Sequence, residues 1–335
     1  MHQQVILFGS PGTGKSFSVK KKLEKVSSDK IFRVTIHPEF QYTDFIGQIL
    51  PNTTPGGRTT FTFKEGPFTQ ALMEAYVDSN KAVYLVLEEL SRGNVAAIFG
   101  DIFQLLDRDE HFISKYPIRN ENIAKKITVL TTDEIVLPSN FNIICTVNMN
   151  DQNVFPMDTA FKRRFDWEYV STDPAVDENG NRYSKLNNPN LNIAISSDRS
   201  EDLKVTWQSF YMILNRFITS KEKGLGKKED KQVGQFFIDF GRKLTEKSHS
   251  TNPKDIESAN KEINIIIKNK LLNYLWYDVQ GTSSFKNSVS LFDENISSYD
   301  DLYKKMGTEK IFSDVFINEF LKPNISLYPY EEKKA

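Results

Sequence analysis

The chain has 335 residues and carries 43 Lys and Arg side chains against 44 Asp and Glu, a net charge of −1. A dedicated DNA-binding domain usually has a basic excess, so any nucleic-acid contact must come from a local patch, a ring of subunits or another chain. The single cysteine, Cys145, excludes an internal disulfide. No apolar run approaches the roughly 18 residues of a membrane span, and we expect no signal peptide, which indicates a cytoplasmic protein without membrane contact.

The segment Gly9–Ser16 fits the pattern G-x-x-x-x-G-K-[ST] at every fixed position. The apolar run Val5–Phe8 before it predicts a buried strand, and the spacing of apolar residues in Phe17–Val26 predicts a helix. In this context the loop's N–H groups and the start of the helix favour a triphosphate. Lys15 would then reach the β- and γ-phosphates, and the Ser16 hydroxyl would ligate Mg²⁺.

The nucleotide-binding candidates are the residues of this loop and the first helical residue after it. They are Gly9, Pro11, Gly12, Thr13, Gly14, Lys15, Ser16 and Phe17.

A second strand is predicted over Ile31–Ile36, followed by a Pro-, Gly- and Thr-rich loop or flexible hairpin over about 51–60. Pro67 favours the first position of a helix that we expect to reach Tyr76. The apolar run Ala82–Leu87 predicts a third, buried strand. These elements alternate as in an α/β fold.

Two acidic residues, Glu88 and Glu89, end that buried strand. A carboxylate pair at such a strand end is common as a solvated terminus. After a phosphate loop it instead favours a catalytic function, with Glu88 supporting the magnesium shell and Glu89 polarising the attacking water.

Residues 94–106 predict a helix, 110–140 an insertion of short strands, and Phe141–Val147 a further buried strand that ends in Asn148. An amide at that strand end is well placed to hold the lytic water or the γ-phosphate. Farther along, Arg163 and Arg164 fit either an ordinary surface helix end or arginines that act on a neighbouring subunit's nucleotide.

Alternation of strands and helices predicts an α/β core with a parallel sheet over residues 1–170, and ligands at the carboxyl ends of its strands. Residues 171–200 are rich in Asn, Asp, Ser and Pro and predict an insertion or linker. Amphipathic helices are expected over 203–218 and 263–277, with a charged, Gly-broken connector over 221–231. Residues 201–335 therefore predict a smaller, mostly helical lid domain.

Together these segments resemble the AAA+ superfamily and, within it, the McrB-like NTPases of modification-dependent restriction systems. The resemblance covers residues 4 to about 280 and rests on an ordered set of motifs. These are Gly9–Ser16, His37–Gly47, Phe63–Phe68, Glu88–Asn94, Val147–Asp151, Met157–Phe165, Val233–Phe237 and Lys270–Leu275.

This resemblance implies that Asn148 and Asp151 position the catalytic water or its partners, and that Arg163 and Arg164 act across a subunit interface. The implied catalytic residues are Glu89, Asn148, Asp151, Arg163 and Arg164, with Ser16 and Glu88 at the metal. The chain departs from the family pattern at Gln152, where Arg is frequent, and at Glu88, where Asp is usual.

The family further implies a homo-oligomeric ring, commonly a hexamer, that hydrolyses nucleotide and translocates DNA for a separate McrC-like nuclease subunit. DNA recognition would lie in a preceding domain or another subunit. The family favours GTP over ATP, and the sequence has no guanine-reading motif such as N-K-x-D that would decide between the two nucleotides. Two other functions stay open: a MoxR- or dynein-like ATPase that remodels proteins, and an assembly subunit that binds nucleotide without turnover.

Overall fold

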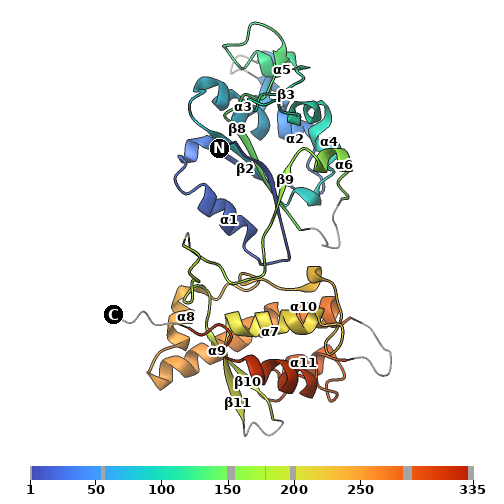
Figure 1. The fold of residues 1–335 in the computed structure, drawn as a ribbon. Helices are drawn as coiled ribbons and strands as arrows, with labels where there is room; N and C mark the ends of the chain where they lie inside the picture. Colours follow the sequence, from blue (N-terminus) through green and yellow to red (C-terminus); the bar gives the residue numbers. More distant parts are fainter. Residues whose placement is uncertain are drawn as a thin grey trace. The chain divides into compact units, whose positions relative to one another are not determined.

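A computed structural model of the protein describes residues 2–53, 57–148, 155–177, 179–196, 201–281 and 289–330. The chain forms two compact units (Figure 1). Unit 1 comprises residues 1–9 and 15–170, and unit 2 comprises residues 10–14 and 171–335. The short segment 10–14, inside the phosphate-loop pattern, thus groups with the second half of the chain.

Unit 1 is built on a five-stranded, fully parallel sheet, which confirms the predicted α/β fold. The strand order is β2-β5-β8-β1-β9. The strands are β1 (Gln4–Phe8), β2 (Ile31–Thr35), β5 (Val83–Glu88), β8 (Phe141–Val147) and β9 (Asp166–Tyr169). The phosphate loop follows β1, and both acidic residues come at the end of β5, so these groups meet at the carboxyl edge of one sheet.

Helices and short hairpins surround this sheet (Figure 1). The helices are α1 (Lys15–Lys22), η1 (Ser28–Lys30), α2 (Tyr42–Ile46), α3 (Pro67–Val77), η2 (Leu90–Arg92), α4 (Val95–Phe99), η3 (Gly100–Leu106), α5 (Glu121–Ala124) and α6 (Thr159–Lys162). The hairpins pair β3 (Gly47–Thr53) with β4 (Thr59–Glu65) and β6 (Ile118–Arg119) with β7 (Glu134–Ile135).

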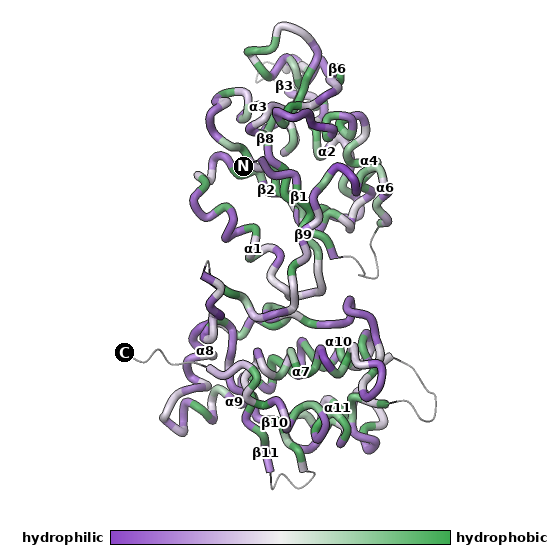
Figure 2. The backbone as a smooth tube through the Cα atoms, viewed as in Figure 1, coloured by the Kyte–Doolittle hydropathy of each residue, from purple (hydrophilic) through white to green (hydrophobic). Residues whose placement is uncertain are grey.

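Side chains alternate between the two faces of the sheet, as they must in extended strands. Leu87 and Cys145 pack in the large cluster that includes α3 and α4, whereas Val86 and Ile144 pack in a smaller one with Val19 of α1. Figure 2 lets the hydrophobic stretches of these strands be followed along the chain. This alternation determines which residues at the strand ends face α1, the helix that follows the phosphate loop.

One predicted helix differs from the structure. The expected helix over 94–106 is divided into α4 and the 3₁₀-helix η3. Gly100 interrupts it with φ 49°, a left-handed conformation that glycine adopts without the steric cost of a Cβ. The region over 51–60 was predicted as a loop or flexible hairpin, and its described residues 51–53 and 59–60 pair in the β3–β4 hairpin.

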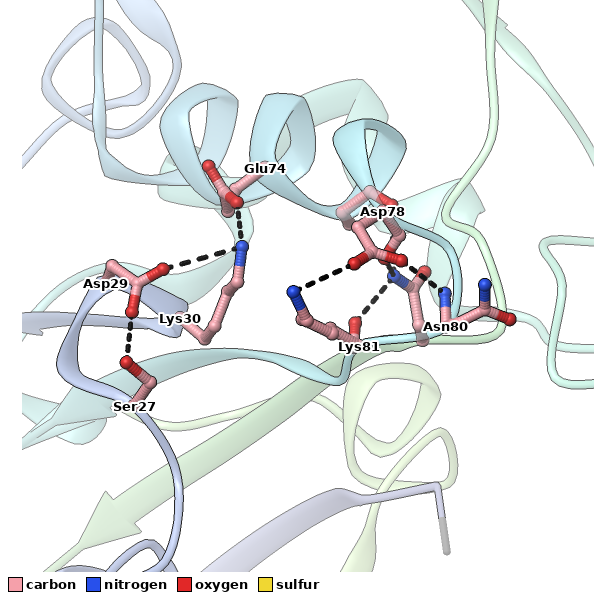
Figure 3. Close-up of polar contacts among 9 residues, drawn as sticks. Ser27, Asp29, Lys30, Glu74, Asp78, Asn80 and Lys81 are labelled. Atoms are coloured by element: carbon pink, nitrogen blue, oxygen red, sulfur yellow. Dashed lines mark hydrogen bonds and ion pairs between the residues drawn. The ribbon is translucent and has the colours of Figure 1, made fainter.

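Polar contacts at the amino-terminal side of the sheet join α3 to the segments that enter the strands (Figure 3). Lys30, just before β2, forms ion pairs with Glu74 of α3 and, at 3.5 Å, with Asp29. Lys81, just before β5, pairs with Asp78 at 3.2 Å. None of the candidate site residues belongs to this group, so we interpret these contacts as structural.

Unit 2 is mostly helical, with one small antiparallel pair of strands, β10 (Asn190–Ala194) and β11 (Asp202–Thr206). Its helices are α7 (Trp207–Thr219), η4 (Glu229–Lys231), α8 (Gly241–Ser248), α9 (Pro253–Lys270), α10 (Leu272–Tyr274), η5 (Leu275–Gln280), α11 (Tyr299–Lys305), η6 (Phe316–Leu321) and η7 (Lys322–Asn324). No helix in the described parts of the chain is long and apolar enough to cross a membrane.

The centre of unit 2 is α7, which is buried on nearly all sides. The helix was predicted to begin at 203 but begins at Trp207, because the Thr206 hydroxyl accepts the Ser209 N–H as an N-cap. The preceding residues Leu203 and Val205 alternate with polar ones and pair with β10 instead. In the sequence, this short alternation of apolar and polar residues resembles the start of the helical pattern that follows it.

Residues 171–200 were predicted as an insertion or linker. Among the described residues of this segment, 190–194 form β10, and the segment groups with unit 2. Three asparagines of this segment, Asn187, Asn188 and Asn190, are buried hydrogen-bonding groups. Asn187 Nδ2 donates to the carbonyls of Gln235 (2.8 Å) and Ile238 (2.6 Å), and its Oδ1 accepts the Phe240 N–H at 2.8 Å. A composition typical of a solvated loop therefore reflects side chains that satisfy buried backbone groups.

Candidate active site

The phosphate-loop pattern lies between the end of β1 and the first turn of α1. Gly12 (φ 74°) and Gly14 (φ 90°) adopt positive φ, which disfavours any residue with a Cβ. The Thr13 hydroxyl donates to the Ser10 carbonyl at 3.0 Å and closes the turn. Gly12 and Gly14 thus occupy positions where the backbone itself favours glycine.

Lys15 begins α1, followed by Ser16 and Phe17. It is only 8% exposed, and its Nζ donates to the Gly9 carbonyl at 3.0 Å. Burial lowers the pKa of the Lys15 ammonium, and the negative charges of Glu89 and Glu88 oppose that shift. A cation held in a partly desolvated place gains from an anionic ligand, because charges attract more strongly where water is excluded.

Glu88 is held by groups from three neighbouring segments. Its Oε2 accepts hydrogen bonds from Ser16 Oγ at 3.0 Å and from Thr146 Oγ1 at 2.6 Å, and its Oε1 accepts one from the Arg33 guanidinium. Arg33 lies opposite Val86 in register, so it leaves the sheet on the same face as Glu88. The longer Glu side chain, unexpected at this position, contacts all three donors at once.

This arrangement fits a magnesium ion. Mg²⁺ prefers oxygen ligands and is usually held by one or two carboxylates together with phosphate oxygens and water. The Ser16 hydroxyl and the Glu88 carboxylate are in direct contact and supply such oxygens. Within the described residues, no group of three or more His, Cys, Asp or Glu side chains could hold a metal by itself, so an ion here would depend on the nucleotide's phosphates.

Glu89 follows β5 in a left-handed conformation, with φ 56°. Asn148 Nδ2 donates to both of its carboxylate oxygens, at 3.1 and 2.9 Å, and Arg92 Nε lies 3.2 Å from Oε2. The backbone N–H of Glu89 donates to Thr146 Oγ1 at 3.1 Å. The carboxylate proposed to activate water is therefore fixed at the sheet edge, on a side chain that is still 30% exposed.

The amide of Asn148 is used on one side only. Its Oδ1 is buried and has no hydrogen-bond partner in the described structure. A buried acceptor without a partner is costly, so a donor such as a water molecule would be favoured there. Asp151, which the family resemblance pairs with Asn148 in positioning the water, lies outside the described residues.

The two candidate arginines have different surroundings. Arg164 is 9% exposed at its side chain, where it pairs with Asp107, donates to the Ala160 carbonyl at 2.7 Å and lies 4.1 Å over the Phe103 ring. Arg163 is exposed, and its guanidinium makes no hydrogen bond or ion pair with the described residues. Arg164 is thus held by side chains of its own unit, whereas Arg163 has no such contact among the described residues.

Within unit 2, residues 11 and 12 form backbone hydrogen bonds with the predicted lid element 233–237. Gly234 N donates to the Pro11 carbonyl at 2.9 Å, and Phe236 N donates to the Gly12 carbonyl at 2.7 Å. A Cβ at Gly234 would lie 2.3 Å from the Gly12 backbone, and one at Gly12 equally close to the Phe237 N. Only glycines allow the two segments to approach this closely.

Sequence reasoning missed three of these groups: Thr146, Arg33 and Arg92. Thr146 had a detectable signal, since it is a polar residue in the otherwise apolar stretch Ile143–Val147 before Asn148. Arg33 interrupts an apolar strand in the same way. Their contacts depend on the pairing of β2, β5 and β8, which the linear pattern does not specify.

Comparison with known proteins places this site in a family. A family model for the AAA domain of the dynein-related subfamily matches residues 4–165. The chain is 31% identical over 337 residues to the type II restriction enzyme BsuMI component YdiS of Bacillus subtilis (strain 168), an alignment that covers 92% of this chain and 87% of that protein. It is also 27% identical over 181 residues to the type IV methyl-directed restriction enzyme EcoKMcrB subunit of Escherichia coli (strain K12).

The chain belongs to the McrB-like AAA+ NTPases of restriction systems. Membership confirms the resemblance seen in the sequence and makes the protein a P-loop enzyme that hydrolyses nucleoside triphosphates. The second alignment covers 52% of this chain and only 36% of the Escherichia coli protein. A putative ATPase from Cytophaga hutchinsonii aligns at 17% identity over 52% of this chain and 43% of its own, with a TM-score of 0.33, too low to add to the assignment.

Proposed function

We propose that this McrB-like NTPase is the motor subunit of a DNA restriction complex. It assembles into a homo-oligomeric ring, most simply a hexamer, and hydrolyses GTP in preference to ATP with Mg²⁺. Hydrolysis then drives DNA translocation for a separate, McrC-like nuclease subunit. The preference for GTP, the hexamer, the translocation of DNA and the nuclease partner rest on the family, whereas hydrolysis and the action of one subunit on its neighbour are also supported by the geometry of unit 1.

The observation that carries this proposal is the Glu89–Asn148 pair. A carboxylate held by an amide nitrogen, beside the oxygen of the same amide, which has no partner among the described residues, is suited to orienting one water molecule. In the proposed mechanism Lys15 and the loop hold the phosphates, Ser16 and Glu88 hold the metal, and Glu89 takes a proton from the water aligned with the γ-phosphate. Asp151 would complete the water-positioning group. These residues supply the parts that P-loop hydrolysis needs.

The different surroundings of the two arginines support assembly. Stabilising the charge that develops on the γ-phosphate usually needs an arginine that approaches from outside the binding subunit or from a separate segment. Arg163 is exposed and makes no hydrogen bond or ion pair with the part of the chain that the structure describes, while Arg164 is held by Asp107. We therefore assign the proposed action on a neighbouring subunit to Arg163 and a structural role to Arg164.

Phosphate release from the purified protein, with GTP and with ATP, tests the proposed function when it is measured with and without a candidate McrC-like nuclease subunit. We expect turnover of GTP to exceed that of ATP and to increase when the nuclease subunit is added. DNA cleavage should require both proteins and a hydrolysable nucleotide, because translocation must be driven. Stimulation by an unfolded protein, with none by DNA or the nuclease subunit, would instead indicate a remodelling ATPase.

Arg163→Ala should abolish assembly-dependent hydrolysis and leave nucleotide binding unchanged. Arginines with this role contribute about 10³–10⁵-fold to the rate. Arg164→Ala is the matched comparison: it should lower the unfolding temperature, because it removes the partner of Asp107 and the packing on Phe103.

Mixing variants separates action in trans from action within one subunit. A mixture of Arg163→Ala and Glu89→Gln subunits should regain hydrolysis, because some interfaces then combine an intact Arg163 with an intact Glu89. Mixed oligomers, verified by light scattering, that stay as inactive as either variant alone would contradict the assignment of Arg163.

A further inference from the structure

Thr146 joins the two carboxylates of the site through a single hydroxyl group. It lies in β8, is 1% exposed, and belongs neither to the phosphate loop nor to the acidic pair. Its Oγ1 donates to Glu88 Oε2 at 2.6 Å and accepts the backbone N–H of Glu89 at 3.1 Å. A hydroxyl can donate once and accept at the same time, so both capacities are used on consecutive residues.

The second of these contacts acts on an unusual piece of backbone. Glu89 has φ 56°, in the left-handed region that non-glycine residues seldom adopt. This turn directs successive side chains to different places: Glu88 toward Ser16, and Glu89 toward Asn148. The Thr146 hydroxyl accepts the N–H at the turn itself, so it fixes the point from which the Glu89 side chain starts.

We propose that Thr146 is a positioning residue for nucleotide hydrolysis. Its hydroxyl fixes the Glu88 carboxylate and the Glu89 backbone relative to each other. It does not touch the reacting atoms. Without the Thr146 hydroxyl, Glu88 keeps its contacts with Ser16 and Arg33, but no single group then holds the Glu88 carboxylate and the Glu89 backbone together. The inference rests on the roles proposed above for Glu88 and Glu89.

Thr146→Val tests this, because valine has nearly the shape of threonine and lacks the hydroxyl. A displacement of about 1 Å in a reacting group can cost on the order of 10²-fold in rate. We expect a fall in kcat of that order, while the affinity for nucleotide in the absence of Mg²⁺ stays unchanged because the phosphate loop is untouched. Mg²⁺ increases the affinity for nucleotide, and half of this increase should require a higher Mg²⁺ concentration in the variant, since Glu88 is less well oriented.

Two variants make the result specific. Thr146→Ser keeps the hydroxyl and should recover most of the rate. Ile144→Val alters the same face of the same strand without touching either carboxylate, and should turn over like the parent protein. If Thr146→Val does not fold, Thr146→Ala gives the same comparison, with folding checked by thermal unfolding.

The outcomes separate this inference from the proposed function. A Thr146→Val protein with the parental kcat, or a Thr146→Ser protein as slow as Thr146→Val, would overturn the positioning role even if Glu89→Gln is inactive. If Glu89→Gln itself keeps full turnover, the proposed roles of the acidic pair fail first. Equal losses of kcat and of Mg²⁺-free affinity in Thr146→Val would indicate general damage to the fold and also overturn the inference.

Discussion

Glu89→Gln should abolish nucleotide hydrolysis and leave nucleotide binding intact. Glutamine keeps the size of the side chain and one hydrogen-bond acceptor, but it cannot take a proton from water. Its amide can turn its oxygen toward Asn148 Nδ2, so the local packing survives while the ion pair with Arg92 is lost. Loss of a positioned general base costs about 10²–10⁴-fold in rate.

Phosphate release and equilibrium binding of a fluorescent nucleotide measure the two halves of this prediction. Glu110→Gln is a suitable control, because the Glu110 side chain is 87% exposed and lies outside the site. Near-parental turnover in Glu89→Gln, with the control unchanged, would mean that another group activates the water.

Lys15→Ala should act on binding itself. The substitution removes a cation that the fold holds beside the phosphate loop, and hydrogen bonds to charged groups contribute enough that we expect affinity to fall about ten- to a hundredfold. Lys20→Ala, on the exposed side of the same helix, should bind nucleotide normally. Unchanged affinity in Lys15→Ala would show that the loop backbone alone holds the phosphates.

Stability gives Lys15→Ala a second readout. Burial lowers the pKa of Lys15 in the folded protein, so the charged form is better tolerated in the unfolded chain. At neutral pH the ammonium therefore opposes folding, and its opposition fades only as the pH rises toward the ordinary lysine pKa. Lys15→Ala without nucleotide should be at least as stable as the parent protein, which distinguishes weak binding from misfolding in a thermal unfolding experiment.

Much of the fold could be predicted because its signals are local. The phosphate loop has fixed spacing, and the apolar runs before Glu88 and Asn148 are long enough to predict buried strands. The helix starting at Trp207 was placed four residues too early because its cap, Thr206, follows a short alternating segment that pairs with β10. The burial of Asn187, Asn188 and Asn190 could not be predicted, because buried and solvated asparagines look alike in a sequence.

The candidate site was predictable in its parts and unpredictable in its connections. Glu88, Glu89 and Asn148 were found because polar residues end apolar strands. Thr146 and Arg33 were not found because their contacts depend on which strands are neighbours and on which face each side chain leaves. The arginines 163 and 164 are adjacent and chemically identical, and only their packing distinguishes them.

The contact between Arg33 and Glu88 also has an evolutionary consequence. An aspartate at 88 would be one methylene shorter and would leave the Arg33 guanidinium on β2 without its carboxylate, while a neutral residue at 33 would remove a counter-charge from a glutamate that is only 8% exposed. The two positions should therefore change together in relatives: glutamate on one strand with arginine on its neighbour, and aspartate where the neighbouring strand has an apolar residue. A substitution at one position alone would produce a less fit protein. Selection would therefore preserve the Glu88–Arg33 pair even where an aspartate could serve the chemistry equally well.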